Sequence, residues 1–508
     1  MYTLGFVLVL SGLVGLMLDR KAINMLKYAT VPGLGLWLAG VWTSVSGWGG
    51  LFGQAFTDLI FFTGAALLFR AIGKTGRFAI PAALIAMLTM AGFHQAFEPQ
   101  SSALPVQEAA QSTTITLATD GELLVELSQE TNEERWKRWI GAQGWTTRRA
   151  FSPLEGERTD LDDYFLVDIS KAELSDIKQI ELLIMDSGLA DWVETNEVIK
   201  LELAPAKKLP GLNKLLGVND PSVSEQWAMD ALKMDQLYAL LTSGKVKAKK
   251  QTLVAILDTG VDAKHEDLKA NFRSISKKHN DDPQGHGTHC AGIAGAVTNN
   301  SVGVASMART GDYFNITSVK ALRSGGSGTQ KDIIDAIITA VDGGADVLSL
   351  SLGGFSTQSR QRAYSEAVRY ATDKGAIVVA AAGNSNRDAA TYTPVNATGM
   401  IGVAAIDNQL QRAVFSNKVN KIEMAVAAPG VGIFSTKPNN NYAAHNGTSM
   451  ATPFVSGLLG LMKSIRPELT NKEAYKILYE TGIETKNTNL TGRLIQPAAA
   501  VSRLLEEI

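Results

Sequence analysis

The sequence contains a single cysteine, Cys290, among its 508 residues. An intramolecular disulfide bond needs two cysteines, so the stability of this chain must come from packing and from any metal that it binds. The sequence also has no excess of either charge, because 48 basic and 50 acidic residues leave a formal net charge of −2. This balance argues against a broad surface for polyanions, so nucleic acid is not expected as a partner.

Charge is scarcest at the start of the chain, where residues 1–97 contain only eight charged side chains. Four apolar stretches in this region are each close to the length that crosses a hydrocarbon core. They cover about 2–18, 29–48, 52–69 and 78–97. We therefore predict a transmembrane domain of four helices at 1–97, with the lipid bilayer as its partner. The second stretch is rich in glycine and contains Pro32, so a shallow re-entrant hairpin is the alternative there.

The basic residues predict how these helices are oriented. Arg20, Lys21 and Lys27 follow the first apolar stretch, whereas a cleavable signal peptide carries its basic residues before it. Three more basic residues lie between residues 70 and 77, and the loop at 48–54 has none. Because loops rich in Lys and Arg stay in the cytoplasm, everything after about residue 98 is expected outside it.

A linker and a small α+β module are predicted next. Residues 98–120 are polar, contain proline and lack periodicity, which is typical of an exposed tether. The module at 121–203 should place two helices on one antiparallel sheet, a pattern that by itself fits a spacer or adhesive domain equally well. Its predicted strands are 121–129, 146–152, 164–170 and 191–203, and its predicted helices are 131–143 and 172–188. A second exposed connector is expected at 204–218.

From about residue 252, short β-branched strands alternate with amphipathic helices. This pattern predicts an α/β domain whose parallel sheet is covered by helices on both faces. The predicted strands are 252–257, 314–321, 345–351 and 376–381. The functional crevice of such a sheet lies beyond the carboxyl ends of its strands, so polar residues directly after apolar runs are the candidates for a site.

Three polar side chains stand out by this criterion. Asp258 ends the apolar run of the first of these strands. His286 lies in the sequence Gly-His-Gly-Thr-His at 285–289, whose glycines let the backbone come close to the imidazole. Ser449 lies in Gly-Thr-Ser-Met-Ala-Thr-Pro at 447–453, a tight turn before an apolar run of helical length. An acid, a base and a nucleophile are therefore all present.

Five motifs occur here in the order typical of subtilisin-like serine peptidases. They are Leu-Asp-Thr-Gly-Val-Asp at 257–262, the segment 285–292, Ser-Leu-Ser-Leu-Gly-Gly at 349–354, Ala-Ala-Ala-Gly-Asn at 380–384, and the serine motif at 447–453. Residues 219–508 therefore resemble the catalytic domain of a subtilase, in particular the thermitase and proteinase K branches. The resemblance implies a subtilisin-like parallel sheet with helices on both faces and a serine endopeptidase that hydrolyses peptide bonds.

The resemblance also assigns chemical roles. A serine hydroxyl is a weak nucleophile, so His286 would take the proton of Ser449 while Asp258 orients the imidazole and stabilises the imidazolium. The side-chain amide of Asn384 and the backbone N–H of Ser449 would donate to the tetrahedral oxyanion. Cys290 would be the buried free thiol that the named branches carry beneath the histidine.

Substrate binding follows from the same resemblance. Two segments resemble the strands between which the family holds an extended peptide by main-chain hydrogen bonds. These segments are Ser351-Leu352-Gly353 and Gly326-Ser327-Gly328. Gly353, Ala381 and Gly383 would line an uncharged primary pocket, for which we expect large apolar or aromatic residues before the scissile bond. Broad activity on peptide or protein substrates is implied.

A structural calcium ion is implied at 298–304, which resembles the tight metal-binding loop of the family. Its ligands would be hard oxygen atoms, a set that favours calcium over zinc. They are the Asn300 side chain, the carbonyls of Thr298, Val302 and Val304, and the carboxylates of Asp220 and Asp267. A plain asparagine-rich turn is the alternative. Zinc at His289 and Cys290 is not expected, because no further cluster of ligands accompanies them in the sequence.

The module at 121–203 resembles the inhibitory propeptide of subtilases, a ferredoxin-like α+β unit, although 153–162 has the character of an insertion. We expect it to inhibit the peptidase intramolecularly, with an autocleavage site in the connector at 204–218. Sequons at Asn299 and Asn446 adjoin the metal loop and the nucleophile, where N-glycosylation would be harmful. A prokaryotic cytoplasmic membrane, with the catalytic domain on its outer side, is therefore the expected location.

The leading hypothesis is a membrane-tethered, extracytoplasmic serine endopeptidase that processes itself. One alternative is a membrane receptor or scaffold whose subtilase fold binds peptides without cutting them, against which the presence of all the catalytic residue types argues. Another alternative makes the helical bundle a transporter or sensor regulated by the protease domain. Apart from Asp58, however, the apolar stretches offer no polar path for transport.

Overall fold

The structure is a computed structural model, and it describes residues 115–169, 171–202, 209, 216–309, 312–356 and 362–507. The predicted transmembrane helices at 1–97 lie outside these residues, as do most of the linker at 98–120 and most of the connector at 204–218. In the part of the chain that is described, no helix has both the length and the apolar character needed to cross a membrane.

The larger part of the described chain is built on a six-stranded parallel sheet with the order β14-β13-β11-β9-β6-β7. Its strands are β6 (Thr252–Asp258), β7 (Phe314–Lys320), β9 (Val347–Leu350), β11 (Ile377–Ala381), β13 (Ile401–Ile406) and β14 (Met424–Pro429). The strands are buried runs of aliphatic residues, as expected for a sheet covered on both faces. The predicted parallel α/β sheet is confirmed.

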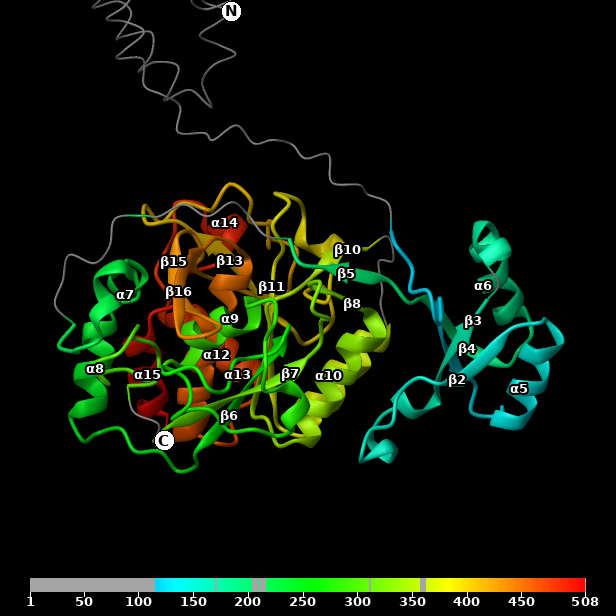
Figure 1. Cartoon of the computed structure of the whole chain (residues 1–508), viewed down its shortest axis with the longest axis horizontal. Helices are drawn as coiled ribbons and strands as arrows, with labels where there is room; N and C mark the ends of the chain where they lie inside the picture. The colour runs from blue at the N-terminus through cyan, green and yellow to red at the C-terminus, as the bar shows by residue number, and fades with distance from the viewer. Residues whose placement is uncertain are drawn as a thin grey trace, which may run out of the picture. The chain divides into compact units, whose positions relative to one another are not determined.

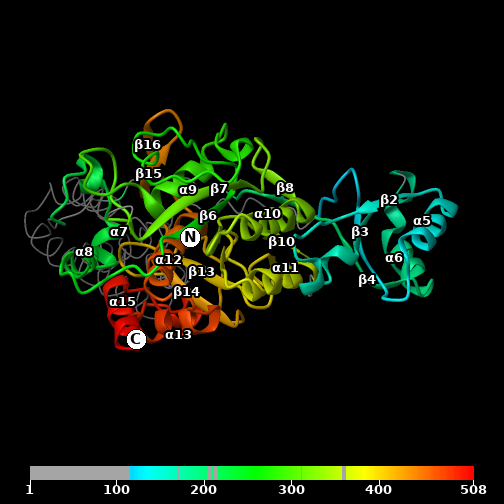
Figure 2. The ribbon, with the colours of Figure 1, turned by 90° about the horizontal axis from the view of Figure 1, so that it is seen from below.

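Successive residues of each strand point to opposite faces, and each face has its own hydrophobic core. Val254 and Ile256 of β6 pack with α9 (His286–Gly295) and α12 (Thr448–Ile465), whereas Ala255 and Leu257 pack with α10 (Gln330–Asp342) and α11 (Arg362–Asp373). The first face also carries α8 (Met234–Thr242), α13 (Asn471–Thr481) and α15 (Pro497–Glu506) (Figure 1, Figure 2).

The smaller elements connect and extend this framework. They are α7 (Ala228–Ala231), β10 (Gly354–Phe355), β12 (Tyr392–Thr393), β15 (Ile433–Lys437), β16 (Asn441–His445) and α14 (Thr488–Thr491). Every residue of α12 is buried, because this helix crosses the sheet beneath the other helices of its face. Gly457 permits the crossing with α9, since a Cβ atom there would lie 2.5 Å from the carbonyl oxygen of Ala294.

The predicted α+β module is a four-stranded antiparallel sheet with the order β2-β3-β1-β4. Its elements are β1 (Leu123–Leu127), α5 (Glu133–Ala142), β2 (Thr146–Arg149), β3 (Tyr164–Asp168), α6 (Ile177–Asp186) and β4 (Ala190–Thr195). One face of the sheet packs against α5 and α6. Leu124 and Leu166 on the opposite face join the hydrophobic cluster of α10 and α11.

The predicted strand at 191–203 is two strands. β4 ends at Thr195, and β5 (Val198–Lys200) leaves the module to pair antiparallel with β8 (Ser327–Thr329) of the α/β domain. The predicted helix at 172–188 likewise begins as a 3₁₀ turn over Lys171–Asp176 and becomes α-helical only at Ile177.

Candidate active site

Asp258, Ser351 and Asn384 lie at or just beyond the carboxyl ends of three neighbouring strands. Asp258 is the last residue of β6, Ser351 follows β9, and Asn384 follows β11 after two further residues. These strands are adjacent in the sheet order β11-β9-β6. The side chains therefore come together at one edge of the sheet, which is where parallel α/β folds form their functional crevice.

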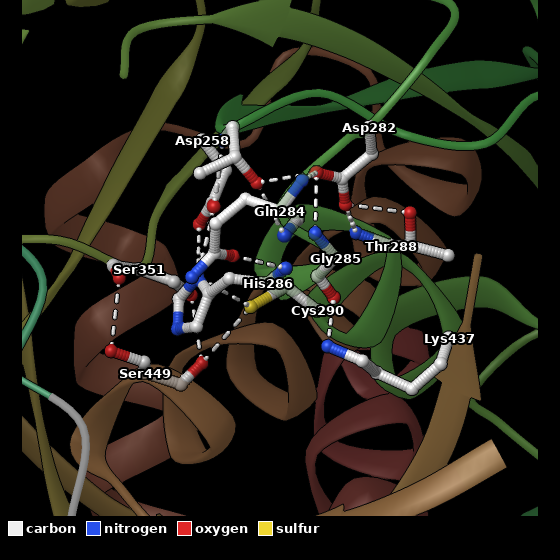
Figure 3. Close-up of polar contacts among 12 residues, drawn as sticks. Asp258, Asp282, Gln284, Gly285, His286, Thr288, Cys290, Ser351, Lys437 and Ser449 are labelled. Atoms are coloured by element: carbon white, nitrogen blue, oxygen red, sulfur yellow. Dashed lines mark hydrogen bonds and ion pairs between the residues drawn. The ribbon is translucent and has the colours of Figure 1, made fainter. Parts of the chain in front are cut away.

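Asp258 and His286 form a buried pair (Figure 3). The Nδ1 atom of His286 lies 2.8 and 2.9 Å from the two carboxylate oxygens of Asp258, and the exposed fractions of the two side chains are 2% and 0%. The close approach depends on Gly287, because a Cβ atom there would lie 2.1 Å from the carbonyl oxygen of Gly260. The predicted acid and base are thus in hydrogen-bond contact.

Asp282 fixes the turn that presents His286, and the sequence analysis missed it. Its carboxylate accepts from the backbone N–H groups of Gly285 and Thr288 at 2.7 and 2.8 Å, and from the Thr288 hydroxyl at 2.7 Å. It therefore supplies the acceptors that the first turn of α9 needs. An aspartate four residues before the histidine was the only signal in the sequence.

Two opposing effects set the pKa of His286. Burial lowers the pKa of this imidazole, but the negative charge of Asp258 and its hydrogen bond outweigh that effect and hold the pKa well above its ordinary value. The Nε2 atom is buried and has no hydrogen-bond partner among the described residues. One nitrogen is therefore held by the acid while the other is left for a proton transfer.

Ser449 is the second residue of α12 and lies beside this pair (Figure 3). Its hydroxyl donates to the carbonyl oxygen of Ser351 at 2.9 Å, and the Ser351 hydroxyl donates to the carbonyl oxygen of Ser449 at 2.8 Å. The thiol of Cys290 lies 3.5 Å from the same Ser449 carbonyl and 3.9 Å from Nδ1 of His286. The serine is therefore close to the pair, with its hydroxyl turned toward Ser351.

The side chain of Asn384 is oriented by Thr448, the residue before the serine. Its Oδ1 atom accepts from the backbone N–H and the hydroxyl of Thr448 at 2.8 and 2.9 Å. Its Nδ2 atom donates to the main-chain carbonyl of Glu202 at 2.7 Å. The predicted oxyanion donor thus holds a peptide carbonyl that belongs to the end of the α+β module.

The segment before Glu202 is extended along the predicted substrate strand. Val198–Lys200 pairs with Ser327–Thr329, and the N–H of Leu201 donates to the carbonyl of Gly326 at 2.9 Å. Ile199 is buried beside Gly354, which directly follows the other predicted substrate segment, Ser351-Leu352-Gly353. Residues 198–202 therefore lie along the predicted substrate segments, with their backbone paired as that of an extended peptide would be.

Of the predicted pocket residues, Gly353 lies near Ala381, and Gly383 directly precedes Asn384, which holds the Glu202 carbonyl. A Cβ atom on Gly353 would lie 3.8 Å from the carbonyl oxygen of Ala381, and one on Gly383 would lie 2.4 Å from Nδ2 of Asn417. The residue that carries the held carbonyl is Glu202, whereas the uncharged lining led us to expect a large apolar residue before the scissile bond. Its carboxylate accepts from the Ser385 hydroxyl at 2.9 Å.

The predicted calcium ligands are also near one another. The carboxylate of Asp267 accepts from Nδ2 of Asn300 at 2.9 Å and from the N–H of Val304 at 2.8 Å. The carboxylate of Asp220 accepts from the N–H groups of Asn299 and Asn300 at 2.8 and 3.2 Å. The hydroxyl of Thr298 accepts from the N–H of Ser306.

The charge at this loop suits a hard cation. Asp220 and Asp267 are both buried, and burial, followed by the nearby charge of Asp220, raises the pKa of Asp267 to about 7. Neither carboxylate forms an ion pair with a basic side chain of the described residues. Two buried carboxylates that lack a cationic partner are costly, and a calcium ion would compensate their charge.

The site resembles that of a serine peptidase, because it combines a buried Asp-His pair, a serine at the start of a helix and an amide that donates to a peptide carbonyl. These groups lie at the edge of the parallel sheet where such folds bind their substrates. Comparison with known proteins specifies the family. Residues 249–496 match the subtilase family.

Curated relatives and a solved structure agree with this match. The chain is 41% identical over 252 residues to thermitase of Thermoactinomyces vulgaris, which covers 48% of this chain and 85% of thermitase. It is 45% identical over 216 residues to a thermophilic serine proteinase of Bacillus sp. strain AK1, which covers 42% of this chain and 52% of that protein. A protease structure from Pseudoalteromonas arctica matches with a TM-score of 0.50 and 29% identity, covering 56% of this chain and 99% of that one. The chain belongs to the subtilase family and is a serine endopeptidase.

Proposed function

We propose that this subtilase uses Asp258, His286 and Ser449 as its catalytic triad and Asn384 as its oxyanion donor, and that its first substrate is its own chain after Glu202. The observation that carries this proposal is the 2.7 Å hydrogen bond from Nδ2 of Asn384 to the main-chain carbonyl of Glu202. The amide that would donate to the oxyanion thus already donates to the carbonyl from which that oxyanion would form.

The geometry suggests how the reaction begins. The Ser449 hydroxyl turns from the Ser351 carbonyl to Nε2 of His286, which takes its proton as the oxygen attacks the carbonyl carbon. Asp258 stabilises the resulting imidazolium, because its carboxylate lies against Nδ1. Asn384 and the N–H of Ser449 stabilise the negative oxygen of the tetrahedral intermediate.

The second half of the reaction uses the same groups in reverse. His286 gives its proton to the leaving amine, the C–N bond breaks, and an ester between Ser449 and the carbonyl carbon remains. A water molecule then attacks this ester, with His286 again acting as base, and the free carboxylate and the serine hydroxyl are regenerated.

The α+β module would act as an intramolecular propeptide. Its sheet packs on the cluster of α10 and α11, and β5 pairs with β8, the predicted substrate segment, as a substrate would. The bond that follows Glu202 lies at the end of the predicted module, just before the connector at 204–218. After cleavage the module would be held without a covalent link, so its dissociation would open the site to other substrates.

A structural calcium ion is proposed at the loop 298–304. Asp220, Asp267 and Asn300 would hold it together with the carbonyls of Thr298, Val302 and Val304, and the ion would supply the positive charge that the two buried carboxylates lack. It would stabilise the loop and take no part in the reaction.

A membrane anchor at 1–97 with the peptidase outside the cytoplasm is proposed from the apolar stretches and basic loops of the sequence. In a Ser449→Ala chain, which should stay intact, the catalytic domain should remain in the membrane pellet after carbonate extraction. Recovery of the intact chain in the supernatant would contradict an integral membrane anchor.

A fluorophosphonate probe tests the catalytic proposal, because it labels a serine only where an activated nucleophile is present. The purified full chain should be labelled and should split into two fragments on a gel. Ser449→Ala should be neither labelled nor split, and Ser456→Ala, another serine of α12, should behave like the wild type. Equal splitting of the wild type and Ser449→Ala would contradict self-processing.

A further inference from the structure

We propose that the primary pocket of this peptidase selects glutamate before the scissile bond, that the Ser385 hydroxyl and the Asn384 N–H bind its carboxylate, and that the charge of Arg387 adds to the preference. The inference rests on the proposed function, because it takes the Glu202 carbonyl as the one that is attacked. It replaces the large apolar residue that the uncharged lining of Gly353, Ala381 and Gly383 led us to expect.

The backbone and the side chain of Glu202 are held by the same short segment. Asn384 donates to the main-chain carbonyl of Glu202 through Nδ2 at 2.7 Å and to its carboxylate through the backbone N–H at 3.2 Å. The Ser385 hydroxyl donates to the same carboxylate oxygen at 2.9 Å. Recognition of the side chain is therefore coupled to placement of the carbonyl on the oxyanion donor.

Arg387 is a positively charged side chain whose field acts on this carboxylate. Burial raises the pKa of Glu202, and the hydrogen bonds from Ser385 and Asn384, followed by the positive charge of Arg387, counteract that effect. The backbone N–H of Arg387 donates to Asn417 at 2.8 Å, and its guanidinium lies 5.7 Å from the ring centroid of Phe355. The cation is therefore anchored at its backbone and supported by an aromatic ring beside the substrate strand.

The lining of the pocket provides donors that a carboxylate satisfies and an apolar side chain does not. A phenylalanine in place of Glu202 would take away the acceptor of the Asn384 N–H and one of the partners of the Ser385 hydroxyl. Leaving the Asn384 N–H without an acceptor on binding is unfavourable. A glutamine would keep an acceptor of the same shape but lose the attraction to Arg387, so the comparison of Glu with Gln isolates the charge.

Matched peptide substrates test the inference on the processed full chain. We would compare Val-Ile-Lys-Leu-X 4-nitroanilides, which carry the sequence 198–201 followed by Glu, Gln or Phe. Because hydrogen bonds to a charged group are the stronger class, kcat/KM for the Glu peptide should exceed that for the Gln peptide by about tenfold to a hundredfold. Phe should be cleaved more slowly than Glu.

Variants identify the residues responsible. Arg387→Gln and Ser385→Ala should each lower the ratio of kcat/KM for Glu to that for Gln, whereas Arg503→Gln, the same charge change on the remote helix α15, should keep it. Charge exchange provides a second readout. A Glu202→Lys chain should process itself slowly, and the added change Arg387→Glu should restore its cleavage.

The outcomes separate the two proposals. If the enzyme is labelled by the fluorophosphonate and cleaves the Gln or Phe peptide at least as well as the Glu peptide, the specificity inference is overturned while the proposed function stands. If the Glu preference is present but Arg387→Gln and Ser385→Ala leave the ratio unchanged, the assignment of these residues is overturned. If no peptide is cut and no serine is labelled, the proposed function fails and the inference fails with it.

Discussion

At the scale of single residues, the proposed triad predicts that the buried contact between Asp258 and His286 sets the response of the enzyme to pH. The imidazole must be neutral to take the proton of Ser449, and Asp258 holds the pKa of His286 above its ordinary value. kcat/KM should therefore rise as the pH increases through the pKa of His286. A pH profile of peptide cleavage measures this rise.

Asp258→Asn removes the charge that raises this pKa. Burial then meets less opposition, so the midpoint of the profile should move to lower pH, while the rate falls by roughly 10⁴-fold because the orienting acid is lost. Asp281→Asn, at an exposed carboxylate paired with Lys320, is the matched control and should leave the profile unchanged. An unshifted midpoint in Asp258→Asn would refute the role given to Asp258.

The amide of Asn384 should matter for turnover more than for binding. Asn384→Ala removes a donor that acts on the oxyanion, so kcat should fall by about a hundredfold to a thousandfold with a small change in KM; this magnitude is borrowed from subtilisin, a relative of this chain. Asn386→Ala, which removes an exposed amide two residues away, is the control. Steady-state kinetics on a peptide substrate would decide, and a loss confined to KM would count against the oxyanion role.

Some of these residues could be found in the sequence and some could not. Asp258, His286 and Ser449 stand at the ends of apolar runs or in glycine-rich turns, which local patterns reveal, and Asn384 was assigned through the family resemblance. Ser385 and Arg387 belong to no motif. Their significance depends on where Glu202 lies, and that position arises only when the module folds against the peptidase.

At the scale of secondary structure, the break between β4 and β5 could not be predicted from the periodicity of the sequence. Residues 191–203 read as one alternating strand, yet the carbonyl of Glu197 accepts from the backbone N–H of Gln330, and Oδ1 of Asn196 accepts from the backbone N–H of Lys331. These contacts with the start of α10 redirect the chain into the cleft. The strands β13 and β14 were missed because short alanine-rich runs carry little strand signal.

Ile199 should anchor β5 in the cleft. Its side chain is buried in the cluster that contains Leu352 and Tyr392, and an Ile→Ala change in a packed cluster costs about 2–5 kcal/mol. In the uncleaved Ser449→Ala chain, Ile199→Ala should speed hydrogen exchange of the β5 and β8 amides at least tenfold. Leu182→Ala, at an exposed position of α6, should not do so. Equal exchange in both variants would show that Ile199 does not hold the strand.

The loop 298–304 should depend on calcium. An ion that binds only the folded state at a thousand times its Kd adds about 4 kcal/mol to the free energy of unfolding, so a chelator should lower the Tm by several degrees. Asp267→Asn should abolish this sensitivity, whereas Asp262→Asn, outside the proposed ligand set, should keep it. A Tm that chelation leaves unchanged would remove the calcium ion from the account.

At the scale of the whole molecule, the alternation of strands and helices predicted the parallel sheet because both of its faces are covered. The faces have separate cores, and the site forms where three neighbouring strands end. The four membrane helices remain a prediction from hydropathy, since the structure describes the chain only from residue 115 onward. Under the proposed self-processing, one chain would contain both an enzyme and its first substrate.

The position of the first cut tests the central claim most directly. Intact mass and amino-terminal sequencing of the fragments from the purified full chain should give a new amino terminus at Leu203, and hence a carboxyl terminus at Glu202. The Ser449→Ala chain, treated in the same way, should yield neither fragment. A first cut at another bond, or a cut after Glu202 that persists in Ser449→Ala, would contradict the account.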